Sequence, residues 1–406
     1  IRDVAPSRGL GDVYKRQGLT LASCKKDDGM KHVEEQRTFS VENVMTPKKF
    51  VQSGSFKGEG TPPVVMPGQS VNFRFNAGKG QSVMFVTMYG KSKDWFFAPA
   101  NPGIMLFDSK GKAMTGDVSS QIKLWDNGTK DNMTGEAESK PITEVSGVDA
   151  GMLLKVTLSY EETASEFTLT IMNASKGTEH ETPFSPGVWA VSAFDGKSLV
   201  APEPFFSAGV KSNPEISAIA QMGDITPLKT MLEANTGIMT GISPVMVVIY
   251  DKEMNPVFEP GKKDSGMGLK EIAQSGDIGK LKANLMKTKG VNGVYVAGDS
   301  PVGPGQKVSV RYKAAKGCKL AFITMYGFSN DWFYANEMTV PALDRGDITS
   351  KAALFDSGTG VSQYPGAGNM QALFGGVPKP ESKPVAKVGN EFPVPSVGQV
   401  LKITIE

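Results

Sequence analysis

The phrase MYGKSKDWFFA occupies Met88–Ala98, and a close copy of it, MYGFSNDWFYA, occupies Met325–Ala335. The two copies extend into a longer alignment without gaps, in which residues 67–96 match residues 304–333 at a constant offset of 237. Of these 30 aligned positions, 17 are identical. Chance does not produce such agreement, so the sequence indicates a duplicated domain.

Both copies carry the alternation of apolar and polar residues that is typical of a half-buried strand. This pattern is present in SVNFRFNA at 70–77 and in KVSVRYKA at 307–314. A denser apolar run follows in each copy, SVMFVTMYG and then KLAFITMYG, as expected for a central strand. The 46 Gly and 26 Pro also favour many short strands joined by tight turns. We therefore expect a mainly β protein.

The duplication extends beyond the opening phrase and determines the expected domain organisation. GDVSSQIKLWDNGT at 116–129 is echoed 230 residues later by GDITSKAALFDSGT. Two similar strands, FSVENV at Phe39 and FTLTIMNAS at Phe167, look like the beginning of each copy. We expect two tandem antiparallel β-sandwiches, the first at 38–160 and the second at 165–406.

A second, shorter repeat lies within the expected second domain, at 185–290. Its copies begin with SPGVWAV and SPVMVVIY and end in helical segments interrupted by Gly223-Asp224 and by Gly276-Asp277. Each copy predicts a strand, a loop and two short helices. Because helices of this length are stable only when docked, we expect this insertion to cover an end of the second sandwich.

Two pairs of aspartates recur with the duplication, Asp94 with Asp126 and Asp331 with Asp356. The first Asp of each pair follows a dense apolar strand, and the second opens a Gly-containing turn, DNGT or DSGT. Strand ends of a sandwich collect loops at one edge, so we expect each pair to converge. Carboxylates held close together repel each other. Calcium, which binds carboxylate and loop carbonyl oxygens, is the commonest remedy.

The motif S-x-D-W-F, followed later by W/F-D-x-G-T, is similar to the spondin N-terminal domain. Versions of SPGVWAV, F-x-x-G and A-x-x-G-D, which bacterial members of that family carry, are present as well. The resemblance extends from Phe39 to Glu406. It implies a β-sandwich related to C2 domains, with calcium bound at one edge by three acids. These are the Asp of S-x-D-W, the Asp that opens D-x-G-T, and an acid four residues after that.

Carried over to this sequence, the first two acids are the aspartate pairs named above, but the third position differs in both copies. It is Lys130 in the first copy and Gly360 in the second. A small shift of the loop would let Asp131 or Asn132 substitute in the first copy, or the Lys130 ammonium group would itself neutralise the carboxylates. We expect calcium binding to be weaker than in the family, or lost.

Each of these residues also has a purely structural explanation. Asp126, Asn127 and Gly128 suit a hairpin turn by composition alone. Asp94 would cap a following turn through its side-chain oxygen. Trp95 and Trp332 fit core or rim packing better than an aromatic platform for a ligand at the loop edge.

Residue counts exclude several functional classes. Lys and Arg (44) nearly balance Asp and Glu (42), so nothing indicates binding to nucleic acid or directly to a membrane surface. The two histidines, His32 and His180, lie away from the repeated phrase, which leaves most hydrolytic triads without a base. Two cysteines, Cys24 and Cys318, are too few for a disulfide framework or a Cys-based zinc site.

The beginning of the sequence predicts export and a lipid anchor. LASC at 21–24 resembles a bacterial lipobox, in which cleavage precedes a cysteine that receives lipid, here Cys24. The following Lys-Lys-Asp-Asp is similar to a signal that sends bacterial lipoproteins to the outer face of the outer membrane. We interpret residues 18–37 as a truncated signal with a charged tether, and residues 1–17 as a sequence artefact.

These observations favour a non-enzymatic, surface-anchored binding or adhesion lipoprotein with a glycan or a matrix-like protein as its partner. Two weak sites on one anchored chain gain affinity through effective concentration. A glycoside hydrolase that uses Asp94 and Asp126 as its two carboxyl groups is an alternative. A third reading is a structural subunit of a surface scaffold, for which an exposed strand edge would be the mark.

Overall fold

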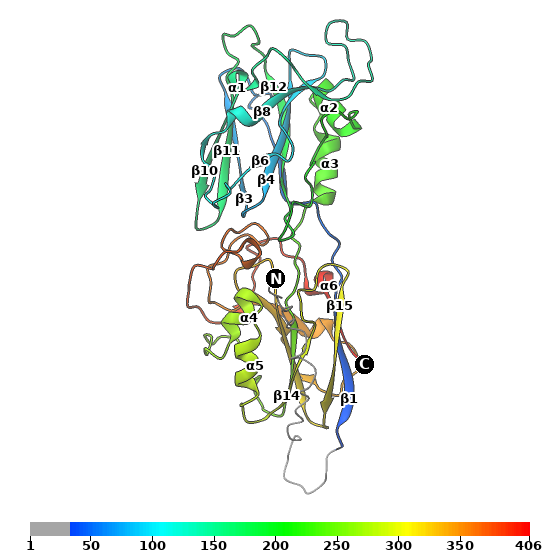
Figure 1. Ribbon diagram of the computed structural model, residues 1–406, viewed down its shortest axis with the longest axis vertical. Helices are drawn as coiled ribbons and strands as arrows, with labels where there is room; N and C mark the ends of the chain where they lie inside the picture. The colour runs from blue at the N-terminus through cyan, green and yellow to red at the C-terminus, as the bar shows by residue number, and fades with distance from the viewer. Residues whose placement is uncertain (1–32) are drawn as a thin grey trace, which may run out of the picture.

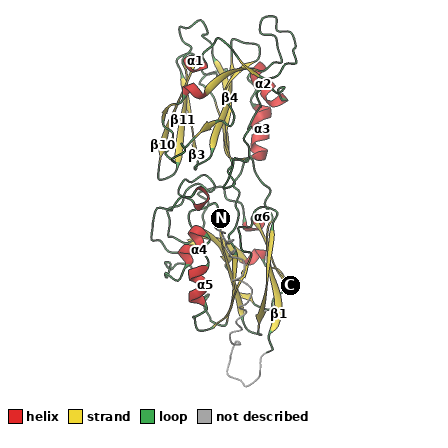
Figure 2. Cartoon of the chain, viewed as in Figure 1, coloured by secondary structure: helices red, strands yellow, loops and turns green. Residues whose placement is uncertain are grey.

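The computed structural model describes residues 33–406, and this part of the chain is a mainly β protein. It contains four antiparallel sheets and a few short helices. The sheets are divided between two units that lie end to end along the long axis of the molecule (Figure 2). Between Val33 and Glu406, no helix is long and apolar enough to span a bilayer.

The first unit contains two of the sheets, three α-helices and one 3-10 helix. Its elements are β2 (Phe50–Phe56), β3 (Ser70–Asn76), β4 (Ser82–Tyr89), β5 (Trp95–Pro99), β6 (Ile104–Met105), β7 (Gly116–Asp117), η1 (Ser119–Gln121), β8 (Ile122–Asp126), β9 (Thr143–Glu144), α1 (Ala150–Leu153), β10 (Leu154–Glu161), β11 (Glu166–Asn173), β12 (Phe184–Ser192), α2 (Pro214–Met222) and α3 (Thr226–Asn235). The seven-stranded sheet has the order β2-β12-β4-β5-β8-β9, with β6 paired to β4, and the four-stranded sheet has the order β3-β11-β10-β7.

The second unit repeats this arrangement. Its elements are β1 (Glu35–Asn43), β13 (Val245–Tyr250), α4 (Leu269–Ser275), α5 (Gly279–Leu285), β14 (Val291–Ala297), β15 (Lys307–Ala314), β16 (Lys319–Met325), β17 (Trp332–Asn336), β18 (Val340–Pro341), β19 (Gly346–Asp347), η2 (Thr349–Lys351), β20 (Ala352–Asp356), η3 (Ala372–Phe374), β21 (Ala386–Lys387), α6 (Val397–Val400) and β22 (Leu401–Ile405). The sheet orders are β14-β13-β16-β17-β20-β21, with β18 paired to β16, and β15-β1-β22-β19.

Two strands lie in different units from those that the sequence indicated. The strand at Phe39, expected to open the first unit, is β1 of the second, where Phe39 lies opposite Val310 of β15 and Ile405 of β22. The strand at Phe167, expected to open the second unit, is β11 of the first and lies opposite Phe75 of β3. An alternating pattern shows which face of a strand is buried but not which strands flank it, so the two similar strands could not be assigned from sequence.

The first unit is therefore inserted into the second. The chain forms β1, leaves the second unit after Asn43, builds the whole first unit, and returns at Val245 with β13. Two connecting segments, 44–49 and 236–244, run between the units (Figure 1). The second unit thus consists of one short segment from before the insertion and a long one from after it.

The shorter repeat at 185–290 is likewise shared between the units and does not form one insertion in the second. Helices α2 and α3 pack on the seven-stranded sheet of the first unit, where Ile216 and Leu228 join a buried cluster with Val86 of β4. Helices α4 and α5 do the same in the second unit through residues such as Ile272 and Leu281. Each helix pair covers a sheet face (Figure 1), because its apolar stripe matches the apolar outer side of the central strands.

Within each unit, side chains from both sheets contribute to one buried cluster. In the first unit, the Phe73 ring of β3 stacks on Trp189 of β12 with 4.9 Å between ring centroids. In the second, Phe39 of β1 contacts Phe322 of β16 at 5.6 Å. Full burial of one such aromatic side chain stabilises a fold by about 1.5–3 kcal/mol, so these clusters are a main source of stability.

The units meet through a long loop of the second unit. Equivalent backbone bonds, from Lys140 N–H to the Gly128 carbonyl and from Lys383 N–H to the Gly358 carbonyl, close this loop in each unit. Lys383 lies 25 residues after Gly358, whereas Lys140 lies only 12 residues after Gly128. The second unit therefore has a longer loop, and the additional residues extend toward the first unit.

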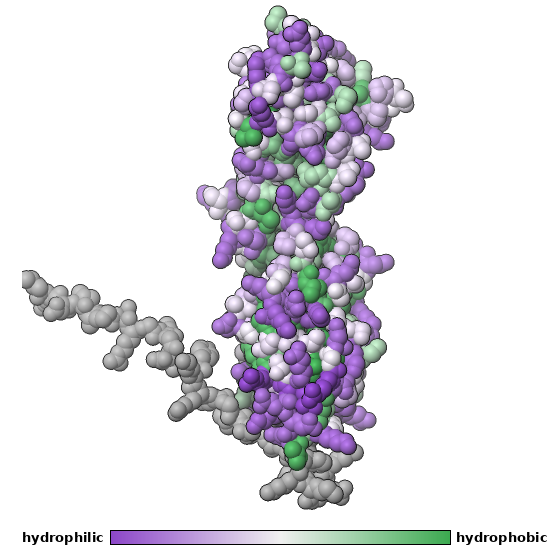
Figure 3. Space-filling model, turned by 90° about the vertical axis from the view of Figure 1, so that its right-hand side faces the viewer, coloured by the Kyte–Doolittle hydropathy of each residue, from purple (hydrophilic) through white to green (hydrophobic). Residues whose placement is uncertain are grey.

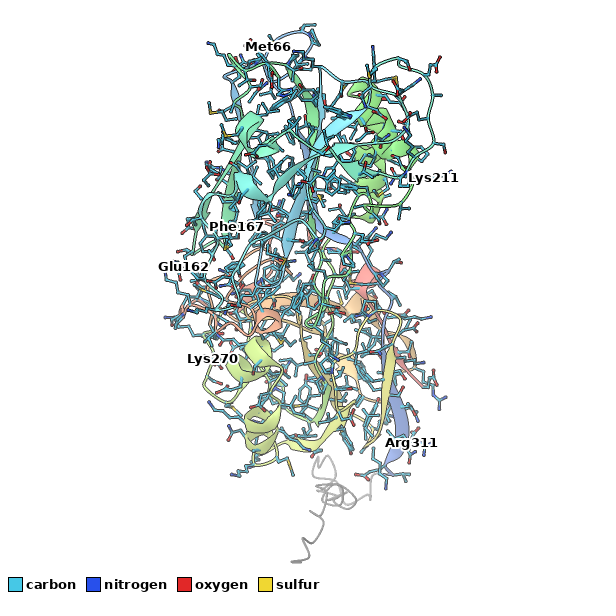
Figure 4. All side chains as sticks on the ribbon, turned by 45° about the horizontal axis from the view of Figure 1, so that its top comes forward. Met66, Glu162, Phe167, Lys211, Lys270 and Arg311 are labelled. Atoms are coloured by element: carbon cyan, nitrogen blue, oxygen red, sulfur yellow. The ribbon has the colours of Figure 1, made fainter. Side chains whose placement is uncertain are left out.

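Residues of this loop make both polar and apolar contacts with the first unit. The Gln81 side-chain amide donates to the Gly366 carbonyl at 3.1 Å, and Gln363 donates to the Thr163 carbonyl at 3.0 Å. The Phe374 ring stacks on Phe194 with 5.8 Å between centroids. Glu162, next to Thr163, lies at this junction in Figure 4. The two units are thus joined by packed contacts as well as by the two connecting segments.

Candidate functional site

Strand register brings the two aspartates of each pair to neighbouring positions. In the first unit, Trp95 at the start of β5 lies opposite Asp126 at the end of β8, so Asp94 is one residue from that pairing. In the second unit, Trp332 lies opposite Asp356 in the same way, and Asp331 precedes Trp332. The convergence expected from the sequence therefore results from the antiparallel pairing of two short strands.

The two sites lie in different surroundings because corresponding strands of the two units run in the same direction along the molecule. Strand β4 begins beside Gln81, which contacts the second unit, and ends at Tyr89, shortly before Asp94. The first pair therefore lies at the far end of the molecule, the end at which Met66 is labelled in Figure 4. The second pair lies beside the loop that forms the junction, because the turn following Asp356 leads directly into it.

Asp94 is fully buried and serves as the anchor of the turn that follows β8. Its Oδ2 accepts hydrogen bonds from Thr129 N (2.8 Å), Thr129 Oγ1 (2.9 Å) and Lys130 N (2.8 Å). Its Oδ1 accepts from Asn132 Nδ2 at 3.1 Å. Both carboxylate oxygens are therefore satisfied by donors from one loop, as a buried charge requires.

Asp126 is also held by neighbouring donors. Its Oδ1 accepts from Gly128 N at 2.8 Å, and its Oδ2 accepts from the Trp95 indole N–H at 3.1 Å and from Asn132 Nδ2 at 3.4 Å. The Trp95 ring is half-buried and packs near Tyr89 with centroids 5.9 Å apart. Trp95 thus positions Asp126. Its counterpart Trp332 is only 2% exposed, so Trp332 is not an open platform for a ligand.

The second pair has the same framework with one difference. Asp331 is fully buried, and its Oδ2 accepts from Thr359 N (2.7 Å), Gly360 N (2.9 Å) and the Ser357 hydroxyl (2.7 Å). Its Oδ1, although buried, has no hydrogen-bond partner among residues 33–406. Ser362 occupies the place of Asn132, and its hydroxyl donates to Asp356 Oδ2 at 3.2 Å.

The environment of Asp331 disfavours its charged form. Burial, and then the neighbouring Asp356 carboxylate, raise the pKa of Asp331 to about 6 from 3.8. A proton or a cation at the unpartnered oxygen would relieve both effects. A cavity of about 150 Å³, lined in part by Asp356 and Trp332, adjoins this pair.

In each copy, the residue at the position of the third acid donates a backbone hydrogen bond to the first Asp of the pair. Lys130 and Gly360 each donate their backbone N–H, and Lys130 forms no ion pair within the described chain. Asp131 uses its Oδ1 to accept from Met133 N and Thr134 N, so this carboxylate caps its own turn. No cluster of three or more acidic, His or Cys side chains suited to a metal occurs in residues 33–406. The proposed lipidation site, Cys24, lies outside the described residues.

Two glutamines that the sequence reasoning did not single out support the sites from the helices. Gln221 of α2 donates to Thr129 Oγ1 at 2.8 Å, and Gln274 of α4 donates to Thr359 Oγ1 at 3.0 Å. These threonine hydroxyls in turn contact Asp94 and Asp331. The signal was present in the sequence, because both glutamines occur in the repeated phrases AQMGD and AQSGD.

Comparison of the sequence with models of known protein families and with curated proteins gave no match.

Proposed function

We propose that each unit is a β-sandwich of the C2-like type found in spondin N-terminal domains. The shared buried cluster between the four-stranded and seven-stranded sheets of each unit supports this assignment. The position of S-x-D-W at the start of β5 and β17, opposite D-x-G-T at the end of β8 and β20, also supports it.

The function that the geometry favours is binding at a bacterial cell surface, by a lipoprotein anchored through Cys24. The observation that carries this proposal is the location of the Asp94 edge at one end of an elongated molecule. Strand β1, which follows the anchor region, begins at the opposite end (Figure 1). A lipid at Cys24 would therefore hold the second unit near an outer membrane and present the loops of the first unit outward. We expect a glycan or a matrix-like protein as the partner, with no role in nucleic-acid binding.

The environment of the carboxylates favours binding over hydrolysis. Glycoside hydrolysis needs two carboxyl groups flanking a sugar, one of them able to donate a proton. Both oxygens of Asp94 are already occupied by four protein donors, and the residue is fully buried. The face of the molecule in Figure 3 is mostly hydrophilic, with hydrophobic residues scattered over both units. The alternatives are a glycan-active enzyme and a scaffold subunit, and a binding experiment distinguishes both from a binding protein.

Binding to immobilised glycans and matrix proteins tests this function directly. We expect residues 33–406 to bind a member of such a panel without turnover. Met133 is 94% exposed in the loop of the first site. The substitution Met133→Lys should weaken binding at least tenfold. Met338→Lys, at a 57% exposed position of the second unit, is the matched control and should bind normally. Turnover that is lost in Asp94→Asn would favour the enzyme, and concentration-dependent self-assembly without ligand binding would favour the scaffold.

Calcium fits the second site better than the first. Asp331 Oδ1 is a buried oxygen without a donor, and Asp356 is its neighbour, so these two carboxylates would hold the ion. A bound cation would supply positive charge to a pair whose like charges repel. In the first site the corresponding oxygen already accepts from Asn132, so the residues there do not fit an ion.

Melting experiments with calcium and with a chelator test the second site. A ligand that binds only the folded state at ten times its Kd stabilises it by about 1.4 kcal/mol, which follows from RT ln(1 + [L]/Kd). We expect calcium to raise the melting temperature of the wild type. Asp331→Asn should abolish this rise, because it removes a carboxylate that would hold the ion. Magnesium, which demands stricter octahedral geometry, is the control ion. An unchanged melting temperature at millimolar calcium would contradict the assignment.

A further inference from the structure

Asn132 occupies a position between the two carboxylates of the first site. Its Nδ2 donates to Asp94 Oδ1 at 3.1 Å and to Asp126 Oδ2 at 3.4 Å. Its Oδ1 accepts from the backbone N–H of Lys93 at 2.9 Å, and this bond fixes which end of the amide faces the carboxylates. The amide therefore presents both of its N–H groups to the aspartate pair.

This arrangement gives the pair the positive partner that its charges require. The amide N–H groups carry partial positive charge and contact both carboxylates. The remaining donors, Thr129 and Lys130 N–H, act on the other oxygen of Asp94. A cation placed between the carboxylates would meet these N–H dipoles with the wrong sign and would have to displace the amide.

The second unit shows what the site is like without this residue. Ser362, which corresponds to Asn132, contacts Asp356 and accepts from the Trp332 indole, but its contacts do not extend to Asp331. Asp331 Oδ1 is left buried and unpartnered within the described chain. The same framework therefore has its gap filled by an amide in one copy and not in the other.

We propose that Asn132 is a built-in replacement for the cation, so that the first site keeps its structure without any metal. The assignment goes beyond the proposed surface binding and is independent of it. It makes the loops at the outer end of the molecule insensitive to calcium, while any response to calcium comes from the second unit. Asn132, and not Lys130, is then the residue that compensates for the missing third acid.

Hydrogen exchange of the Thr129 and Lys130 amides tests this assignment, because both donate to Asp94. The full chain carrying Asp331→Asn is the parent, so that the second site cannot respond to calcium. In this parent we expect the same slow exchange with calcium and with a chelator. Adding Asn132→Asp replaces the two donors by a third carboxylate. Exchange should then become at least tenfold faster in chelator and return toward the parent value in calcium.

Two results would overturn the proposal that Asn132 replaces a cation. Calcium protection of these amides in the Asp331→Asn parent would overturn the proposal, because the amide would then coexist with an ion. An Asn132→Asp protein that folds but does not respond to calcium would also overturn it, because the amide would not occupy a cation position. If Asn132→Asp does not fold, Asn132→Ser copies the second unit at this position. It should show faster exchange in chelator and a calcium response that the parent lacks, and absence of both would reject the proposal.

Discussion

Asp94→Asn is expected to destabilise the protein by about 2–4 kcal/mol, because the substitution leaves buried hydrogen-bond donors without an acceptor. Asp94 receives four hydrogen bonds, three on Oδ2 and one on Oδ1. An asparagine has only one oxygen, so its NH2 group must face either the N–H groups of the turn or the NH2 group of Asn132. Either orientation brings donors against donors around a fully buried side chain.

Thermal unfolding of Asp94→Asn measures this loss. For a unit of this size each kcal/mol lowers the melting temperature by about 2–4 °C, so a decrease of about 4–16 °C is expected. Asp108→Asn is the matched control, because Asp108 Oδ1 alone accepts from Lys110 N and Lys112 N at 2.9 Å and an asparagine oxygen preserves both bonds. A change in Asp94→Asn no larger than that of the control would mean that the buried carboxylate does not hold the turn.

Asp331→Asn should have the opposite effect at neutral pH in the absence of calcium. The asparagine oxygen can accept from the turn, while its NH2 group takes the place of the unpartnered Oδ1. The substitution also removes a buried charge beside a like charge. The pKa of Asp331 is raised from 3.8 to about 6, and a shift of this size corresponds to up to about 3 kcal/mol of stability.

The sign of the pH dependence follows from this raised pKa. Folded Asp331 holds its proton more tightly than the unfolded chain does, so its favourable contribution is complete below about pH 3.8 and is lost as the pH rises through 6. The variant lacks this titration. The stability difference between Asp331→Asn and wild type, measured in chelator, should therefore be small near pH 4, should grow in favour of the variant as the pH rises to about 6, and should level off by pH 7.5. A difference that stays constant over this range would contradict the raised pKa.

The sequence was a good guide to the local parts of the sites. The duplicated phrases predicted the β class, and the β class is confirmed by the four antiparallel sheets. The convergence of each aspartate pair followed from strand ends and turns, both of which are local features. Asp94 was expected to cap the turn that follows it, but its carboxylate instead accepts from the Thr129 and Lys130 N–H groups of a turn 35 residues later.

Features that depend on long-range pairing were harder to predict. The strands at Phe39 and Phe167 have the same alternation, so only their actual neighbours distinguish them. Lys130 suggested a compensating charge because side-chain type is visible in a sequence, whereas its backbone N–H is the group that is used. Asn132 was considered as a substitute ligand, but the direction of its amide depends on a bond from Lys93 that no motif encodes.

The position of β1 has a mechanical consequence. A pull applied between the beginning of β1 and the outer end of the first unit would run along this strand, since the chain passes from Asn43 directly into the connection between the units. Antiparallel hydrogen bonds lie perpendicular to their strands, and β1 is bonded to β15 on one side and to β22 on the other. The covalent backbone of β1 carries such a load between its two ends, so the hydrogen bonds on either side of the strand are not what resists it. A pull along this line would thus pass through the second unit without having to unfold it.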